Sequence, residues 1–116
     1  MATLNGTYLF DGSGVQVVGT DRVPIAQAGH VTFDGSGHVP DDLFSRSMNG
    51  VITLNIASTG TYTVNPNCTG TLTVRGVNGA PDIHVDLFIS PDGSKFSFLL
   101  ADPGFVVSGF DLLARS

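Results

Sequence analysis

The chain has 116 residues, enough for one domain, and a formal net charge of −5 from ten aspartates, no glutamate and five Lys and Arg residues. Only 13% of its residues are charged, about half of the ~25% usual in soluble proteins, and its abundant Thr and Val favour sheet over helix. The composition therefore excludes coiled coils, helical bundles and most α/β enzymes. The scattered basic residues argue against nucleic acid as a partner, because phosphate binding requires clustered Lys and Arg.

Turn signals recur at short intervals along the chain. Gly, Pro, Asn and Asp, which supply turn conformations, gather at 11–14, 34–37, 48–50, 65–67, 78–81, 91–93 and 102–104. Between these signals, period-two alternation predicts strands over 4–10, 15–20, 24–34, 38–47, 50–65, 69–76, 82–90 and 94–102, with a closing strand over 105–115. Since about eight strands are expected, either 15–20 is a loop or one pair merges. A short helical turn is possible at 40–44, because Asp42 precedes the apolar residues Leu43 and Phe44 and can cap a helix.

The strands differ in how polar their two faces are. The strand over 82–90 places Ile83, Val85, Leu87 and Ile89 on one face. Residues 60–65 of the strand over 50–65, and the strand over 69–76, alternate apolar residues with threonine, as in antiparallel sheets with one wet side. The last two strands are apolar on both faces, and such strands need cover on both sides. We therefore expect a homo-oligomer in which a partner subunit covers this part of the sheet.

The succession of hairpins favours an up-and-down meander, and a meander of about eight strands can close on itself and remove its edges. The first strand, around Tyr8, is the natural partner of the last. The predicted fold is all-β, a single small antiparallel up-and-down β-barrel over 1–116, with a β-sandwich as the alternative. The interior of such a barrel is either filled with side chains or holds one small ligand.

Four stretches carry a resemblance to known proteins: Gly6-Thr7-Tyr8, VTFDGSG at 31–37, GTYTVNPNCTGT at 60–71 and Asp102-Pro103-Gly104. They resemble a group of small bacterial proteins of unassigned function, many of which carry export signals. In architecture the chain is similar to the allene oxide cyclase-like and calycin barrels, although it lacks the calycin Gly-x-Trp signature and no catalytic residue of the cyclases matches a position here. The resemblance implies a ligand-sized barrel and allows oligomerisation and export.

Asp82, His84 and Asp86 form the sharpest polar pattern, because alternation places them on one face of a strand at intervals of about 7 Å. A carboxylate beside an imidazole can fix its tautomer for acid–base chemistry or help to hold a metal. The opposite face is the most apolar in the chain, so we expect this one to be a wet outer surface. The alternative is that the apolar face contacts another subunit and that His84 and Asp86 point inward.

The remaining polar motifs predict no cofactor or metal. His30 and His38 have no metal-ligand spacing, and Asp41-Asp42 lacks the other ligands of a calcium loop. The Asp-Gly-Ser-Gly motifs at 11–14 and 34–37 lie between strands rather than ahead of a helix, so we expect turns there and no phosphate site. Cys68, the single cysteine, excludes an internal disulfide and is expected to be an inert thiol in a turn.

Arg46 shares a face with Phe44 and Met48. If that face lines the barrel, its guanidinium can anchor a carboxylate or enolate; otherwise it is an exposed arginine on a hairpin. Aromatic residues in phase with the apolar faces pack the core, and in a hollow barrel they line a cavity where Tyr8 and Tyr62 offer hydroxyls. The candidate ligand-binding residues are Tyr8, Phe33, Arg46, Tyr62, Phe96 and Phe98.

We expect a protein that binds a small hydrophobic molecule or serves as an interaction module. One alternative is a cyclase or isomerase that folds a reactive substrate in an apolar cavity, since such chemistry needs few charged groups; another is a structural oligomer with a filled barrel. The sequence does not decide whether the protein is an enzyme. It has no apolar run near the ~20 residues of a membrane helix and no basic stretch or apolar signal core at its start. We therefore expect a cytoplasmic protein or a mature form whose export signal has been removed.

Overall fold

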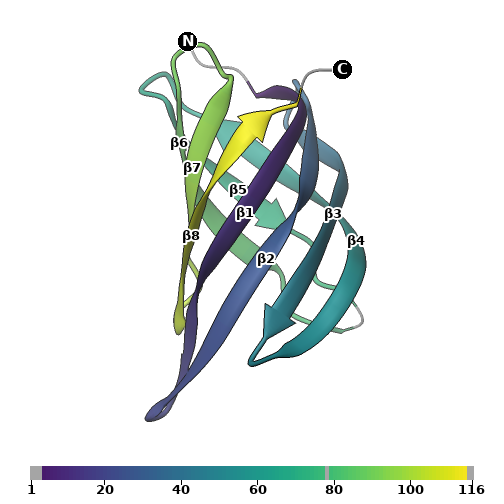
Figure 1. Ribbon diagram of the computed structural model, residues 1–116. Helices are drawn as coiled ribbons and strands as arrows, with labels where there is room; N and C mark the ends of the chain where they lie inside the picture. The colour runs from purple at the N-terminus through teal and green to yellow at the C-terminus, as the bar shows by residue number, and fades with distance from the viewer. Residues whose placement is uncertain (1–3, 78, 115–116) are drawn as a thin grey trace.

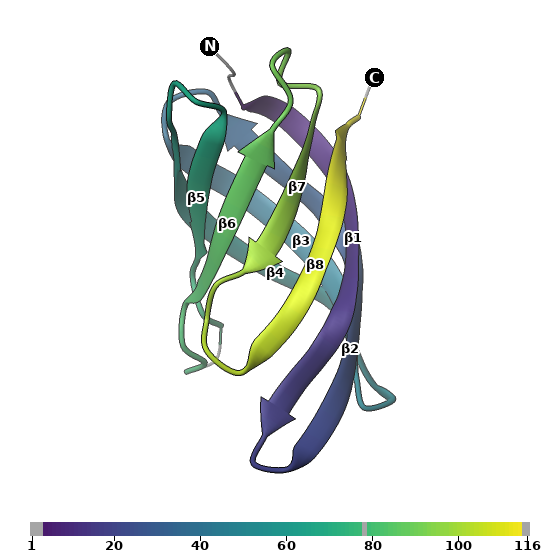
Figure 2. The ribbon, with the colours of Figure 1, turned by 90° about the vertical axis from the view of Figure 1, so that its left-hand side faces the viewer.

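The computed structural model describes residues 4–77 and 79–114 (Figure 1). Its strands are β1 (Asn5–Val18), β2 (Asp21–Asp34), β3 (His38–Met48), β4 (Val51–Val64), β5 (Thr69–Val74), β6 (Ile83–Ile89), β7 (Lys95–Leu100) and β8 (Phe105–Leu113). Each strand pairs with the next, and β8 pairs antiparallel with β1, which closes the sheet (Figures 1 and 2). The predicted all-β, up-and-down barrel is therefore confirmed, and the β-sandwich alternative is wrong. Position 78 in the predicted turn and position 115 in the predicted closing strand lie outside the described residues.

The first strand merges two predicted segments, so the expected turn at 11–14 is wrong. Gly12 and Gly14 of β1 face inward, and β8 lies too close to them to leave room for side chains. A Cβ at Gly14 would be 1.6 Å from the carbonyl oxygen of Val106. These glycines therefore allow a close approach of two strands instead of forming a turn. The same motif at 34–37 does form a turn, because the Asp34 carboxylate accepts hydrogen bonds from the backbone N–H groups of Ser36 (2.8 Å) and His38 (3.0 Å).

β3 runs through 40–44, so the expected helical turn there is wrong. A register shift between Val39 and Asp42 marks a bulge in the β3–β4 ladder, and such a bulge re-aims the residues that follow it. As a result Asp42, Phe44, Arg46 and Met48 face the barrel interior. Among the described residues, no helix is long and apolar enough to cross a membrane.

The end of the barrel where β1 begins and β8 ends is filled by side chains. Phe33 lies at the centre of an aromatic cluster, with its ring centroid 4.8 to 5.7 Å from those of Tyr8, Tyr62 and Phe96. The Tyr62 hydroxyl donates to the carbonyl of buried Leu4 over 2.9 Å, and the Tyr8 hydroxyl donates to the carbonyl of Gly93. These contacts close this end of the barrel.

The opposite end is more open. β5 pairs with β4 only at Gly60–Val64, so the first half of β4 lacks a ladder with β5. The hairpin of β1 and β2 projects beyond the other strands at this end (Figures 1 and 2). The β3–β4 hairpin turns through Asn49 and Gly50 with φ values of 53° and 83°, as a tight type I′ turn requires.

The outside of β6, β7, β8 and β1 is unusually apolar. As expected from alternation, β6 buries Val85, Leu87 and Ile89 and exposes His84 and Asp86. Six large apolar side chains on these adjacent strands are 45–69% exposed, and we call them the outer apolar face: Leu9, Phe88, Leu99, Val106, Phe110 and Leu112. The last two strands are therefore apolar on both sides, as predicted.

Candidate ligand-binding cavity

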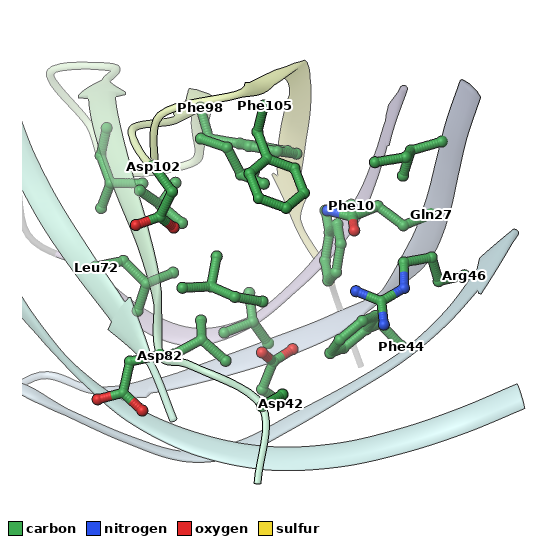
Figure 3. Close-up of a pocket in the computed structure, with 18 of the residues that line it drawn as sticks. Phe10, Gln27, Asp42, Phe44, Arg46, Leu72, Asp82, Phe98, Asp102 and Phe105 are labelled. Carbon is green, nitrogen blue, oxygen red and sulfur yellow. The ribbon is translucent and has the colours of Figure 1, made fainter. Parts of the chain in front are cut away.

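The open half of the barrel contains a cavity of about 490 Å³ (Figure 3). Every strand except β4 contributes lining side chains. Most of these side chains are aliphatic or aromatic, and a few polar groups stand among them. The cavity lies within the range of ~300–1,000 Å³ that is common for small-molecule sites.

The six predicted binding residues divide between this cavity and the closed end. Arg46, Phe96 and Phe98 line the cavity. The ring of Phe98 reaches inward over Gly12, where an added Cβ would lie 2.6 Å from the ring, so the missing side chain makes room for it. Tyr8, Phe33 and Tyr62 lie outside the lining, in the aromatic cluster. Ligand contact by these three residues stays a prediction.

Arg46 is half-buried and faces inward with Phe44 and Met48, so of the two alternatives for this residue the structure shows the inward one. Figure 3 shows it beside Gln27, its register partner on β2. Among the described residues, no carboxylate lies within 4.0 Å of the Arg46 guanidinium, the distance that an ion pair requires. The guanidinium is therefore a cationic group of the cavity wall without an ion-pair partner in the described part of the chain.

Two buried aspartates also line the cavity. Asp42 on β3 is 4% exposed and Asp111 on β8 is 2% exposed, and in each the Oδ1 atom has no hydrogen-bond partner. Burial, with a smaller contribution from the charge of Asp41, raises the pKa of Asp42 to about 7. Burial, followed by the charges of Asp42 and Asp11, raises the pKa of Asp111 to about 8. Both carboxyls therefore keep their protons to a higher pH than an ordinary aspartate does.

Sequence reasoning missed this pair. The sequence did carry a signal for Asp111. It lies on the same strand face as Phe105, Val107 and Leu113 and is thus a lone charge on an apolar face. For Asp42 the strand pattern was insufficient, because the bulge before it sets which way it points.

Two further carboxylates stand toward the open end of the cavity, Asp82 and Asp102. Asp82 accepts a hydrogen bond from the backbone N–H of Gly76 over 2.9 Å. Asp102 contacts His84, with 2.7 Å between Oδ1 and Nδ1 of the imidazole, and its Oδ2 accepts the His84 backbone N–H over 2.8 Å. Slight burial raises the pKa of Asp102, but the hydrogen bonds and the charge of His84 together hold it below its ordinary value.

The outward position of His84 and Asp86 agrees with the expectation for the Asp82-x-His84-x-Asp86 pattern, and the inward alternative is wrong. The expectation that all three share the outer face is wrong for Asp82, which precedes β6 and lines the cavity. The partner of His84 comes from the β7–β8 connection instead of from its own strand, which alternation alone does not reveal. In the described part of the chain, no three His, Cys, Asp or Glu side chains are grouped so that they could hold a metal ion. Cys68 is a free, half-buried thiol in the β4–β5 turn, with a φ of 66°.

Comparisons of the chain with protein-family models, with curated proteins and with solved structures found no match. The likeness to the small bacterial proteins thus rests on the sequence motifs. Of the expected architecture, the structure shows a small closed antiparallel barrel.

Proposed function

We propose that the protein binds a small, mainly apolar molecule inside the barrel. The observation that carries this proposal is the cavity of about 490 Å³, walled by seven of the strands and closed at one end by the aromatic cluster. Unfilled interior volume destabilises a folded protein because the lining atoms lose packing contacts. An occupant supplies those contacts, so a cavity of this size fits a binding protein better than a structural oligomer with a filled barrel.

A matched pair of neighbouring variants tests this proposal. Val74 is buried and lines the cavity, whereas Thr73 points to the outside of the same strand. With N-phenyl-1-naphthylamine as a fluorescent probe, we expect saturable binding to the natural protein. Val74→Phe fills part of the cavity and should weaken that binding roughly tenfold or more, while Thr73→Phe should change it less than about twofold.

Circular dichroism and thermal melting report whether both variants fold, and Ile83→Phe, at a less buried lining position, is a second cavity variant. Two results would overturn the proposal: no saturable binding to the natural protein, or equal binding by both cavity variants and Thr73→Phe.

We further propose that copies of the chain associate through the outer apolar face. Monomers rarely expose a large contiguous apolar patch, and the six residues of this face lie on four adjacent strands. Lys95 stands beside Leu112 and Asp86 beside Leu99, so the face has unlike charges at its two ends. A two-fold axis through its centre would bring Lys95 of one copy toward Asp86 of the other, which favours a second copy as the occupant. We also propose, from the architecture alone, that the protein is similar to the allene oxide cyclase-like and calycin barrels.

A further inference from the structure

We propose that the preferred occupant of the cavity is an apolar molecule with a primary ammonium group, and that this group binds the carboxyls of Asp42 and Asp111. The inference rests on the proposed function and adds the chemical class of the ligand. It comes from three features of the cavity: unpaired buried acceptors, an excess of negative groups and an apolar wall.

The acceptors are unusual for a protein interior. Asp42 and Asp111 are both more than nine-tenths buried, both line the cavity, and each keeps a carboxyl oxygen without a hydrogen-bond partner. Buried polar atoms are nearly always paired, because leaving them unpaired costs the hydrogen bonds that water would provide. The missing partner here is a hydrogen-bond donor that enters through the cavity.

The charges around the cavity select the sign of that donor. Among the residues that the structure describes, four aspartates line it, Asp42, Asp82, Asp102 and Asp111, against one cation, Arg46. The charges that act on the buried pair are also acidic, since Asp41 raises the pKa of Asp42, and Asp42 and Asp11 raise that of Asp111. Every ionised group except Arg46 therefore favours a cation in the cavity and opposes a carboxylate. This reverses the ligand charge that Arg46 alone suggested from the sequence.

An ammonium group matches the pair better than other donors. It carries three N–H donors and no acceptor, so it can donate to the unpaired carboxyl oxygens without leaving an acceptor of its own unpaired, and its charge favours their ionised forms. Burial raises the pKa of both carboxyls in the empty cavity. Binding of an ammonium group therefore lowers these pKa values again and releases protons from the two carboxyls. A hydroxyl has one donor, and a trimethylammonium group has the charge but no N–H. The remaining wall, with Leu72, Val85 and Phe98, suits an alkyl or aromatic body.

Four eight-carbon probes separate charge from hydrogen bonding and from chain burial: octylamine, octyltrimethylammonium, 1-octanol and octanoate. Their affinities are measured by displacement of N-phenyl-1-naphthylamine at pH 7.5 and checked by calorimetry. We expect octylamine to bind roughly tenfold or more tightly than 1-octanol, octyltrimethylammonium to bind less tightly than octylamine, and octanoate to bind most weakly.

The double variant Asp42→Asn with Asp111→Asn keeps the shape of both side chains and removes their charge. It should bind 1-octanol as the natural protein does and lose most of the preference for octylamine, and the two single variants should each lose part of it. Asp21→Asn is the control, because it also removes one negative charge but from an exposed position outside both the cavity lining and the outer apolar face, and it should leave the preference unchanged.

The outcomes separate the two proposals. If 1-octanol binds and octylamine binds no better, or if the double variant keeps the full preference, the ammonium inference is overturned while cavity binding stands. If none of the four probes binds, the proposed function fails, and the inference fails with it.

Discussion

The buried carboxyl pair makes a quantitative prediction about the pH dependence of stability. The pKa of Asp42 rises from an ordinary value of 3.8 to about 7, a rise of about 3 units, and the pKa of Asp111 rises to about 8. Between pH 4 and pH 8 the folded state thus holds protons that the unfolded chain has already released. The free energy of unfolding therefore falls as the pH rises through this window.

The magnitude follows from the size of the rise. At about 1.36 kcal/mol per pH unit, the pKa of about 7 makes Asp42 alone lower the free energy of unfolding by about 3 kcal/mol between pH 5 and pH 9, a large part of the ~5–15 kcal/mol typical of a domain. With about 4 °C per kcal/mol for a chain of this size, the melting temperature should fall by on the order of 10 °C over that range. The measurement is calorimetry from pH 5 to pH 9 at constant ionic strength.

The double variant Asp42→Asn with Asp111→Asn isolates the pair, because it leaves every other titratable side chain of the protein in place. Asp34, Asp92 and Asp102, whose pKa values are lowered, stay ionised throughout this range in both. We expect the variant to lose most of the slope and to melt above the natural protein at pH 8. A melting temperature that stays constant or rises from pH 5 to pH 9, or an equal fall in the variant, would refute the reasoning.

Two further predictions concern the outer face and the β1–β8 seam. Sedimentation should find oligomers of the natural chain and monomers of Phe110→Asp, whereas Thr61→Asp, with the same added charge at an exposed position of β4, should stay oligomeric. A monomeric natural chain would contradict the proposed association. Gly14→Ala should destabilise the barrel by about 2–3 kcal/mol in guanidinium unfolding, because its Cβ would lie 1.6 Å from the Val106 carbonyl oxygen. Ser13→Ala, its outward neighbour, should change stability by less than about 0.5 kcal/mol, and equal effects of the two would argue against a close seam.

The sequence was sufficient for the fold because its signals are local. Period-two alternation and turn residues mark each strand, and hairpin succession leads to a closed meander. Identical local motifs can still differ in structure, as the two Asp-Gly-Ser-Gly segments show. Asp34 closes a turn through its own carboxylate, whereas Gly12 and Gly14 continue a strand because β8, far away in the sequence, packs against them.

The cavity was harder to predict because it depends on which face of each strand is inside. For β3 a bulge decides that question, so Asp42 and Arg46 could not be placed inside from alternation alone. The aromatic residues were recognised as a group, but their division between a closed end and a hollow end depends on three-dimensional packing. Tyr8 and Tyr62 use their hydroxyls to hold backbone carbonyls at the closed end, a contact between segments far apart in sequence.

The most direct test of a hollow barrel with a buried carboxyl pair in its cavity wall is carbon NMR of the aspartate side-chain carboxyls during a titration with octylamine at pH 7. Of the ten aspartates, Asp42 and Asp111 should show saturable shifts toward the ionised form, together with the methyl groups of Leu72 and Val85 in the cavity wall. Asp86 on the outside should stay unchanged. Saturable shifts confined to the outer apolar face, or none at Asp42 and Asp111, would contradict the account.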